Sequence, residues 1–368
     1  MDRVTVVGIG KLGLGFALLL ENGGYDVCGV DIFPDYVKAL NEKTFRTNEP
    51  EYNDLLQQSK NFHAVTSLEE GLRFSDLVFI LVQTPNGGGS RFYDHAVLSK
   101  LLCDINKLQV KNKHIVIGCT VMPKYINDVG TLLIKDCENT TLNYNPEFIA
   151  QGEIIKGFRS PDLILIGTEH AQLASQLRGI YASFVRSEPR YCIVKPLEAE
   201  LVKISINGFI TTKLSFANML SDLCDNIGAN KDTVLDVVGS DSRIGNKYFR
   251  PGFSFGGPCF PRDTKALKQI MDQNNVNSEM LVATTRMNEL HNAFIAEQLL
   301  KENKAEYRLS NVCYKENCNV PIIEESAKCK IAEYLAKRGK RVIIEDEAHM
   351  ILEVQKEYGT LFEYEVRQ

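Results

Sequence analysis

The sequence lacks tryptophan, long hydrophobic runs and any strong excess of charge. Of its 368 residues none is Trp, and 42 Lys and Arg face 47 Asp and Glu, a formal net charge of −5. A balance this mild provides no basic surface for nucleic acid or anionic membranes. No apolar run approaches the ~20 residues that a membrane-spanning helix needs. We therefore expect a protein that binds neither nucleic acid nor membrane.

Paired cysteine spacings are also missing. The ten cysteines are scattered and include no CxxC pair. This argues against a structural zinc site, and a disulfide framework is not expected in a chain of this size. The N-terminus runs directly into the β-branched stretch 4–7, without the cationic region and cleavage site of a secretion signal. We expect a reducing cytoplasm, no metal and mostly buried thiols.

Short β-branched runs alternate with amphipathic segments over the first half of the chain. This alternation predicts an α/β fold with a parallel, doubly wound sheet of the Rossmann type. The expected strands are 4–7, 26–30, 77–82, 114–117 and 163–166, and the clearest helices are 12–21 and 96–108.

From Pro196 onward the pattern becomes helical. Helices are expected over 198–226, 231–238, 265–273 and 280–300, and Leu201, Ile204, Phe209, Leu214, Phe216 and Leu220 are spaced as one face of the first of them. The remainder predicts a strand over 307–313, a helix over 326–338 and a strand over 341–345. We therefore expect three domains: a Rossmann-type domain over 1–195, an all-helical domain over 196–300 and a shortened α/β domain over 301–368.

A glycine-rich loop, Gly8-Ile9-Gly10-Lys11-Leu12-Gly13, joins the first expected strand to the first expected helix. Gly8 permits a tight turn, Gly10 lets the backbone approach a pyrophosphate, and Gly13 allows close packing of helix on strand. The helix N-terminus favours the anion. Asp31 ends the next strand, where a carboxylate accepts hydrogen bonds from ribose hydroxyls and repels a 2′-phosphate. The loop therefore predicts a dinucleotide site that prefers NAD to NADP.

A second loop, residues 253–263, combines glycines, aromatics and a thiol. Cys259 lies four residues before Asp263. If a helix begins near Pro261, the thiol lies at a helix N-terminus, which favours the nucleophilic thiolate. The alternative is one more buried cysteine beside a capping Asp.

Three further residues suit acid–base chemistry. Lys203 and Asn207 are four apart on the long helix and share a face, so that an ammonium and an amide can stabilise an oxyanion together. The alternative is a solvated helix face. Glu147 lies in a Pro turn where a general base can be held, and its alternative is an exposed loop acid.

Taken together, these motifs resemble the UDP-glucose/GDP-mannose dehydrogenase family, most closely its UDP-glucose 6-dehydrogenase group. The resemblance covers roughly residues 1–295. It rests on the segments 8–13, Gln83-Thr84-Pro85, Cys119-Thr120-Val121, Asn145-Pro146-Glu147-Phe148, Ser160-Pro161-Asp162, 198–207, Arg243-Ile244-Gly245-Asn246-Lys247 and Gly256-Gly257-Pro258-Cys259-Phe260.

The resemblance implies an NAD-dependent, four-electron oxidation of the C6 alcohol of a UDP-sugar to a carboxylate. Cys259 would be the nucleophile that carries a thiohemiacetal and then a thioester. Lys203 and Asn207 would stabilise oxyanions, and Asp263 would hold the water and relay protons with Lys203. The implied catalytic residues are Cys259, Lys203, Asn207, Asp263, Glu147 as the base in thioester hydrolysis and Thr120 as the residue that positions a water.

The resemblance also implies binding residues and a homodimer around the long helix, with Arg243 reaching the sugar of the neighbouring subunit. The implied NAD-binding residues are Gly8, Gly10, Lys11, Leu12, Gly13, Asp31, Thr84, Pro85, Thr120 and Arg262. The implied substrate-binding residues are Phe148, Lys203, Asn207, Arg243, Tyr248, Arg250, Phe253, Phe255, Gly256 and Lys315.

The sequence departs from the family's pattern at three positions and in length. Gln151 replaces a common Glu, Leu163 an expected Arg, and Glu324 a common Arg. About 65 residues follow Asn303, fewer than the family's C-terminal domain usually has. Two other functions remain open: a catalytically weak scaffold that binds nucleotide sugars, which the short C-terminal part and Glu324 favour, and a two-electron 3-hydroxyacid dehydrogenase, which has no use for Cys259.

Overall fold

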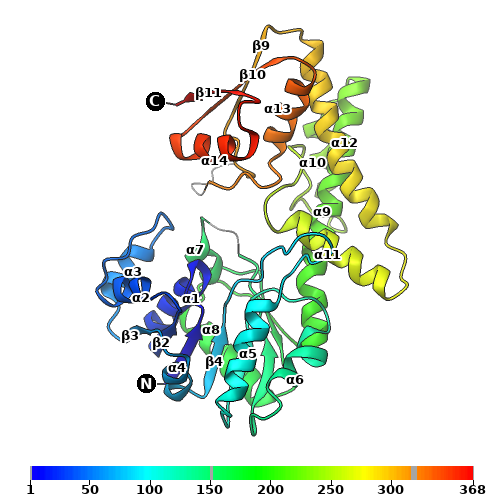
Figure 1. Ribbon diagram of the computed structural model, residues 1–368. Helices are drawn as coiled ribbons and strands as arrows, with labels where there is room; N and C mark the ends of the chain where they lie inside the picture. The colour runs from blue at the N-terminus through cyan, green and yellow to red at the C-terminus, as the bar shows by residue number, and fades with distance from the viewer. Residues whose placement is uncertain (1, 150–151, 316–320, 368) are drawn as a thin grey trace. The chain divides into compact units, whose positions relative to one another are not determined.

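The computed structural model describes residues 2–149, 152–315 and 321–367 (Figure 1). The chain forms two compact units, Met1–Lys203 and Ile204–Gln368. The three-domain division expected from the sequence stays a prediction. Within the described ranges, no helix is both long and apolar enough to cross a membrane.

The first unit is built on an eight-stranded sheet of order β3-β2-β1-β4-β5-β6-β7-β8. The sheet grows outward from β1, through β2 and β3 on one side and through β4, β5 and β6 on the other. This is the strand order of a doubly wound sheet. The strands are β1 (Arg3–Val7), β2 (Asp26–Val30), β3 (Phe62–Val65), β4 (Leu77–Ile80), β5 (His114–Ile117), β6 (Thr141–Tyr144), β7 (Leu163–Gly167) and β8 (Arg190–Val194).

Helices cover both faces of this sheet, as Figure 1 shows. Apolar side chains alternate along β1, so that Val4 and Val6 pack against α1 and α8 while Val7 faces the layer that contains α5. The helices of the unit are α1 (Lys11–Asn22), α2 (Pro34–Asn41), α3 (Tyr52–Gln58), α4 (Leu68–Phe74), α5 (Ala96–Lys107), α6 (Thr131–Leu133), α7 (Ile154–Arg159) and α8 (Ala171–Phe184), with a π-helical turn, η1, over Tyr125–Gly130. The predicted Rossmann-type architecture is confirmed.

The sheet is not parallel throughout, which corrects the prediction. β7 pairs with β6 in the antiparallel sense through one residue pair, Tyr144 and Gly167. β8 then runs parallel to β7. The first six strands therefore share one direction and the last two run against it.

The second unit contains four helices followed by a small α/β region. α9 (Pro196–Ile227) begins in the first unit and continues into the second. The helices after it are α10 (Lys231–Ser240), α11 (Phe260–Gln273), α12 (Glu279–Lys301), α13 (Ala327–Lys337) and α14 (Ala348–Tyr358). The parallel sheet, of order β11-β10-β9, consists of β9 (Glu306–Ser310), β10 (Arg341–Asp346) and β11 (Glu363–Val366).

The apolar face expected on α9 is only partly correct. Ile204 is buried, but Leu201, Phe209 and Phe216 lie exposed. Several buried positions are occupied by small polar residues: Thr211 shares a hydrogen bond with Thr264 of α11 (2.8 Å), and the Ser215 hydroxyl donates to the carbonyl of Thr284 of α12 (3.0 Å). Small side chains allow these helices to approach closely, and their hydroxyls find partners inside the unit.

Candidate active site

The glycine-rich loop has the geometry that a dinucleotide phosphate requires. Gly8 adopts a left-handed φ of 85°, and a Cβ on Gly13 would lie 2.0 Å from the Gly8 carbonyl oxygen. Around Gly10, by contrast, a Cβ would meet none of the described atoms within 4 Å. α1 begins at Lys11 with Gly10 as its N-cap, which provides no side chain to compete for the helix N–H groups. The loop therefore leaves its anion-binding face open.

Asp31 follows β2 directly and remains partly accessible. Burial raises the pKa of its carboxyl group, while hydrogen bonds from nearby backbone N–H groups, including that of Phe33 (3.3 Å), lower it. Ile32 and Phe33 are exposed beside it. A carboxylate next to apolar surface suits a ribose with its base, as expected of an NAD site.

Two threonines meet at the ends of neighbouring strands. The Thr84 hydroxyl, after β4, donates to the carbonyl of Thr120, after β5 (2.8 Å). Thr84 is buried and Thr120 partly so, whereas Pro85 is exposed. The two adjacent parallel strands thus bring these predicted residues together.

Glu147 follows β6 and lies in a polar cluster. The Tyr181 hydroxyl, from α8, bonds both Glu147 Oε1 (2.5 Å) and Asn145 Oδ1 (2.7 Å). Burial raises the pKa of Glu147 to about 7, against smaller opposing effects of Tyr181 and Lys203. The alternative of an ordinary exposed acid is therefore wrong, and a carboxyl that titrates near neutrality is suited to be a general base.

Lys203 is buried in the same cluster, so that the alternative of a solvated helix face is wrong for it. Its ammonium donates to the backbone carbonyl of Glu147 and lies 4.6 Å from the ring centroid of Phe148. The bond fixes the turn that carries Glu147, and the ring places apolar surface against the ammonium. Three predicted residues, Glu147, Phe148 and Lys203, are thus brought together.

Sequence reasoning missed Tyr181, which touches Glu147 directly. It lies fully buried among Phe16, Phe184 and other apolar residues of the core. Its spacing on α8 is that of a core residue, so no sequence signal separated it from the surrounding aromatics.

The predicted thiol lies where a helix begins. Cys259 is the N-cap of α11, and its carbonyl accepts a hydrogen bond from the N–H of Asp263 (2.8 Å). Cys259 is exposed, so the alternative of a buried cysteine is wrong. Asp263 is buried, and the Asn207 amide donates to its Oδ2 (2.5 Å). Arg262, predicted to bind cofactor, lies partly buried in the first turn of the same helix.

The glycines before Cys259 are required by close packing within the second unit. A Cβ on Gly256 would lie 2.2 Å from the Glu325 carbonyl oxygen. Gly257 has φ 80°, and a Cβ there would lie 2.3 Å from the Tyr314 ring. The Gly257 N–H also donates to the Glu324 carbonyl (2.9 Å). These contacts hold the thiol loop against the segment around residues 314 and 324–325.

Side chains of α9 and α12 hold the backbone of residues 252–255, which includes the predicted substrate-binding residues Phe253 and Phe255. Asn288 donates to the Phe255 carbonyl and accepts from its N–H, both at 2.9 Å. His291 Nε2 lies 2.8 Å from the Gly252 carbonyl oxygen, and its Nδ1 lies 2.8 Å from Asp222. Sequence reasoning missed these residues, because a His, an Asn and an Asp on helices look like surface positions.

The remaining predicted substrate residues are spread over the second unit. Tyr248 and Arg250 line a cavity of about 310 Å³. Phe255 is buried, and the half-exposed Phe253 ring lies 5.1 Å from the Lys328 ammonium. Lys315 is partly buried. Arg243 is exposed and pairs with Asp241 (2.6 Å).

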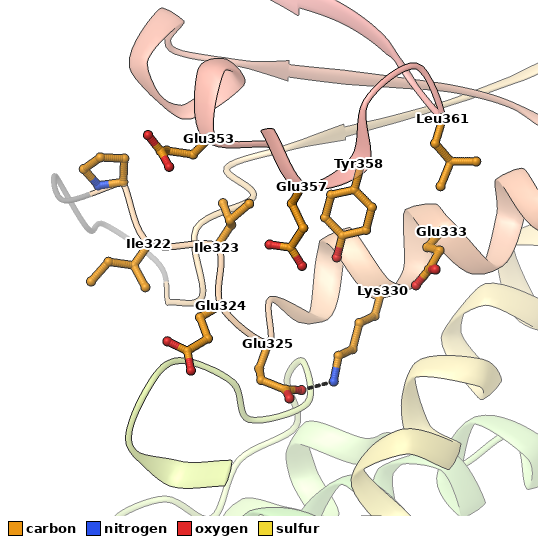
Figure 2. Close-up of a pocket in the computed structure, with 11 residues that line it drawn as sticks. Ile322, Ile323, Glu324, Glu325, Lys330, Glu333, Glu353, Glu357, Tyr358 and Leu361 are labelled. Atoms are coloured by element: carbon orange, nitrogen blue, oxygen red, sulfur yellow. Dashed lines mark hydrogen bonds and ion pairs between the residues drawn. The ribbon is translucent and has the colours of Figure 1, made fainter. Parts of the chain in front are cut away.

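A larger cavity, of about 760 Å³, lies in the C-terminal α/β region (Figure 2). Five glutamates and one lysine line it, together with apolar residues. They are Glu324, Glu325, Glu333, Glu353, Glu357 and Lys330, and Lys330 pairs with Glu325. Such an excess of negative charge repels a diphosphate. Within the described ranges no group of His, Cys, Asp and Glu is arranged to hold a metal ion.

The structure describes two of the three positions at which the sequence departs from the family's pattern. Leu163 begins β7 and is partly buried, as an apolar strand residue should be. Glu324 lines the acidic cavity. Gln151 lies outside the described residues.

Two domain models of one family match this sequence. Residues 2–185 match the NAD binding domain of the UDP-glucose/GDP-mannose dehydrogenase family, and residues 197–290 match its central domain. The chain belongs to the UDP-glucose/GDP-mannose dehydrogenase family. It is thus an NAD-dependent oxidoreductase, which confirms the cofactor expected from the glycine-rich loop and Asp31.

Relatives and solved structures agree with this membership. The UDP-glucose 6-dehydrogenase of Pseudomonas aeruginosa is 31% identical over 305 residues, which cover 81% of this chain and 67% of that protein. The GDP-mannose 6-dehydrogenase of Pseudomonas putida is 29% identical over 362 residues, covering 94% and 81%. A UDP-glucose dehydrogenase from Pyrobaculum islandicum superposes with a TM-score of 0.87 at 27% identity, covering 99% of this chain and 86% of that one. These family members are named for different nucleotide sugars.

Proposed function

We propose that this chain oxidises the C6 alcohol of UDP-glucose, or of a related nucleotide sugar, to the uronic acid through a covalent intermediate on Cys259. The observation that carries the proposal is the exposed Cys259 thiol at the start of α11. Asp263 follows one turn later on the same helix and accepts a hydrogen bond from the Asn207 amide. A two-electron alcohol dehydrogenase needs no nucleophile, whereas a four-electron oxidation to an acid does.

The first unit supports NAD binding with residues that fit its chemistry. The space around Gly10 at the N-terminus of α1 suits the pyrophosphate, and Asp31 suits the ribose hydroxyls. When bound, NAD supplies the hydride acceptor for both oxidation steps. Thr84 and Thr120, joined by their hydrogen bond, provide hydroxyl and backbone groups at the carboxyl ends of β4 and β5.

In the first stage, Lys203 and Asn207 hold the sugar oxygen as the alcohol gives up a hydride and releases its hydroxyl proton to solvent, which yields an aldehyde. They lie one turn apart on α9, so that both residues are on one face of this helix. Cys259 Sγ then bonds to the aldehyde carbon, and the carbonyl oxygen takes up the thiol proton. The thiohemiacetal loses a second hydride and a proton, and becomes a thioester.

In the second stage, water releases the acid. Glu147, with its pKa near 7, takes a proton from a water that Thr120 and Asp263 hold in place. The water oxygen bonds to the thioester carbon, and the carbon–sulfur bond then breaks, with its electron pair going to Cys259. Lys203 stabilises the oxyanion and relays protons with Asp263.

A homodimer around α9 is part of the proposal. Large apolar side chains are exposed along this helix at spacings of seven, three, four and four residues: Phe209 (69%), Phe216 (50%), Met219 (40%), Leu223 (52%) and Ile227 (69%). Such a stripe supports helix-on-helix association. We further propose that Arg243 reaches the sugar bound by the partner subunit. The cytoplasmic location stays a prediction.

The acidic C-terminal cavity favours a second candidate, a catalytically weak scaffold that binds nucleotide sugars. Glu324 and its neighbours do not suit a diphosphate, so the nucleotide end of the substrate would be held weakly there. The complete set of thiol-chemistry residues supports the enzyme instead.

Product stoichiometry tests the proposal. A panel of nucleotide sugars is incubated with NAD, and NADH and uronic acid are both quantified. We expect two NADH per acid, a covalent adduct in Cys259→Ser by intact-mass spectrometry, and none in Cys259→Ala. One NADH per product, with full activity in Cys259→Ala, would overturn the four-electron mechanism, and no NADH with any sugar would favour the scaffold.

A further inference from the structure

The amide of Asn145 has a fixed orientation beside Tyr181. Its Nδ2 lies 2.8 Å from the carbonyl oxygen of Leu165 in β7. A carbonyl oxygen only accepts hydrogen bonds, so that the atom facing it must be the amide nitrogen. The other end of the amide, Oδ1, is therefore the atom that faces the Tyr181 hydroxyl at 2.7 Å.

The Tyr181 hydroxyl has one proton and two oxygen neighbours. Asn145 Oδ1 can only accept, and Glu147 Oε1, at 2.5 Å, also only accepts when the carboxyl is ionised. With Glu147 ionised, one of these two short contacts would lack a proton. With Glu147 protonated, both are satisfied, because Glu147 donates to Tyr181 and Tyr181 donates to Asn145.

We propose that Tyr181 and Asn145 are positioning residues whose hydrogen bonds reverse with the protonation of Glu147. In the protonated state the chain runs from Glu147 to Tyr181 to Asn145. In the ionised state the Tyr181 proton turns to Glu147, and Asn145 Oδ1 loses its donor. The inference rests on the proposed function only where it concerns hydrolysis, since it takes Glu147 as the base of that step.

Charged and titratable groups on neighbouring elements also act on Glu147 and on Tyr181. The groups that act on Glu147 from neighbouring elements are Tyr181 of α8 and Lys203 of α9, and Tyr191 of β8 acts on Tyr181. Lys203 bonds the backbone carbonyl of Glu147 rather than its carboxyl. Asn145 therefore influences the carboxyl through the Tyr181 hydroxyl.

This arrangement of hydrogen bonds favours the transfer of a proton to the Glu147 carboxylate. When the attacking water gives its proton to Glu147 and its oxygen bonds to the thioester carbon, rotation of the carboxyl group turns the new O–H toward Tyr181. The Tyr181 hydroxyl then turns its own proton to Asn145, and the buried amide oxygen regains its donor. Tyr181 keeps a proton throughout, so that no net charge moves onto it.

A double-mutant cycle on the full chain tests the switch. The carboxyl stretch of Glu147, assigned by its loss in Glu147→Gln, is titrated by infrared difference spectroscopy in the wild type, Asn145→Ala, Tyr181→Phe and the double variant. Asn145→Ala removes a bond made only in the protonated state, so it should lower the midpoint, by about one pH unit, or tenfold in the acid constant. In the Tyr181→Phe background the same change should leave the midpoint where it is.

Equal shifts in both backgrounds, or none in either, would overturn the proposal. Because Asn145→Ala also removes the bond to Leu165, fluorotyrosine at position 181 provides a second measurement with the packing retained. A more acidic phenol donates more strongly to a carboxylate, so the midpoint should again fall, and an unchanged or higher midpoint counts against the switch.

Kinetics separates this inference from the proposed function. The pH profile of acid release from the enzyme-bound intermediate is measured in the same variants. A profile that moves with the infrared midpoint supports both the switch and the role of Glu147. A coupled infrared midpoint with an unmoved profile supports the switch and overturns Glu147 as the base.

Discussion

The two α/β regions of this chain treat a strand-end carboxylate in opposite ways. Asp31, after β2, remains partly accessible beside an open glycine loop. Asp346 ends β10 and is buried, with its Oδ2 accepting from the N–H of Val312 (2.8 Å) and its Oδ1 from that of Glu347 (2.9 Å). One carboxylate is available to a ligand and the other is used by the fold. Similar topology therefore does not imply a similar site.

The two regions also differ in how they place charge. In the first, the buried Lys203 ammonium has a carbonyl partner and an aromatic ring. In the second, the described residues that line the cavity include five glutamates and one lysine. We infer that cofactor binding depends on the first region, while the second contributes little attraction for phosphate.

The largest effect is expected at Lys203. Lys203→Ala should lower turnover by roughly 10²–10³-fold, the scale for losing one oxyanion donor. NAD affinity, measured by calorimetry, should stay within about twofold, since the dinucleotide loop is separate. Lys107→Ala, which changes an exposed side chain of α5, is the matched control. A variant that lost NAD affinity as strongly as turnover would contradict this division of roles.

The next effect concerns pH and stability. The pKa of Glu147 is raised from 4.5 to about 7 by burial, so between these values the native chain holds a proton that the unfolded chain has released. Stability therefore falls as the pH rises through this window, by at most about 3 kcal/mol. Glu147→Gln should lose less stability between pH 5 and 8 than the wild type in urea unfolding. The exposed Glu169→Gln serves as the control, and identical slopes for all three proteins would argue against a raised pKa.

A paired substitution sharpens the comparison of the two carboxylates. Asp31→Ala should narrow the preference for NAD over NADP by about tenfold, because the repulsion of the 2′-phosphate is lost, and should leave stability nearly unchanged. Asp346→Asn should leave cofactor selectivity unchanged and lower the free energy of unfolding by about 1–3 kcal/mol, because it removes a charged acceptor from buried N–H groups. Cofactor kinetics and urea unfolding are measured on both, and a selectivity change in Asp346→Asn would break the comparison.

The smallest effect is expected in the acidic cavity. Glu324→Arg should raise affinity for UDP about fivefold at low salt, with the gain lost at high salt, because a repulsive charge becomes attractive. Glu302→Arg, outside the cavity, makes the same charge change as a control. Equal gains in both variants would mean that net charge, and not the cavity, is responsible.

The sequence predicted most of the fold wherever periodicity was strong. The strands over β1, β2 and β5 and the course of α9 agree with expectation. Elements that were not predicted are the strands β3, β6, β8 and β11 and the helices α2, α3, α4, α6, α7, α8 and α14. β3 and β6 contain polar residues such as His63 and Asn143, which weaken the apolar run that marks a strand. The antiparallel seam was not predictable, since strand direction depends on pairing and not on composition.

Residue type and spacing indicated candidate site residues, but they did not indicate which residues these side chains contact. Cys259 at a helix start and Glu147 in a turn both followed from local sequence. Tyr181 and His291 did not, because each acquires its role from a contact distant in the sequence: 34 residues from Glu147 in one case and 69 from Asp222 in the other. Buried polar networks are specified by tertiary packing, which a single sequence leaves implicit.

The single-pair seam between β6 and β7 has a consequence for hydrogen exchange. With one backbone pairing, this boundary is fastened by side chains: Asn145 donates to Leu165 (2.8 Å), and Thr168 donates to Asn143 (2.7 Å). The segment β7–α8–β8 is therefore the natural candidate for a separate opening unit, and its amides should exchange at a lower free energy than those of β1 and β4. Asn145 closes this seam and also bonds the Tyr181 hydroxyl. Each opening of the segment therefore also breaks the hydrogen bond between Tyr181 and the Glu147 carboxyl. Local unfolding of this segment is thus coupled to the hydrogen bonding of the proposed base.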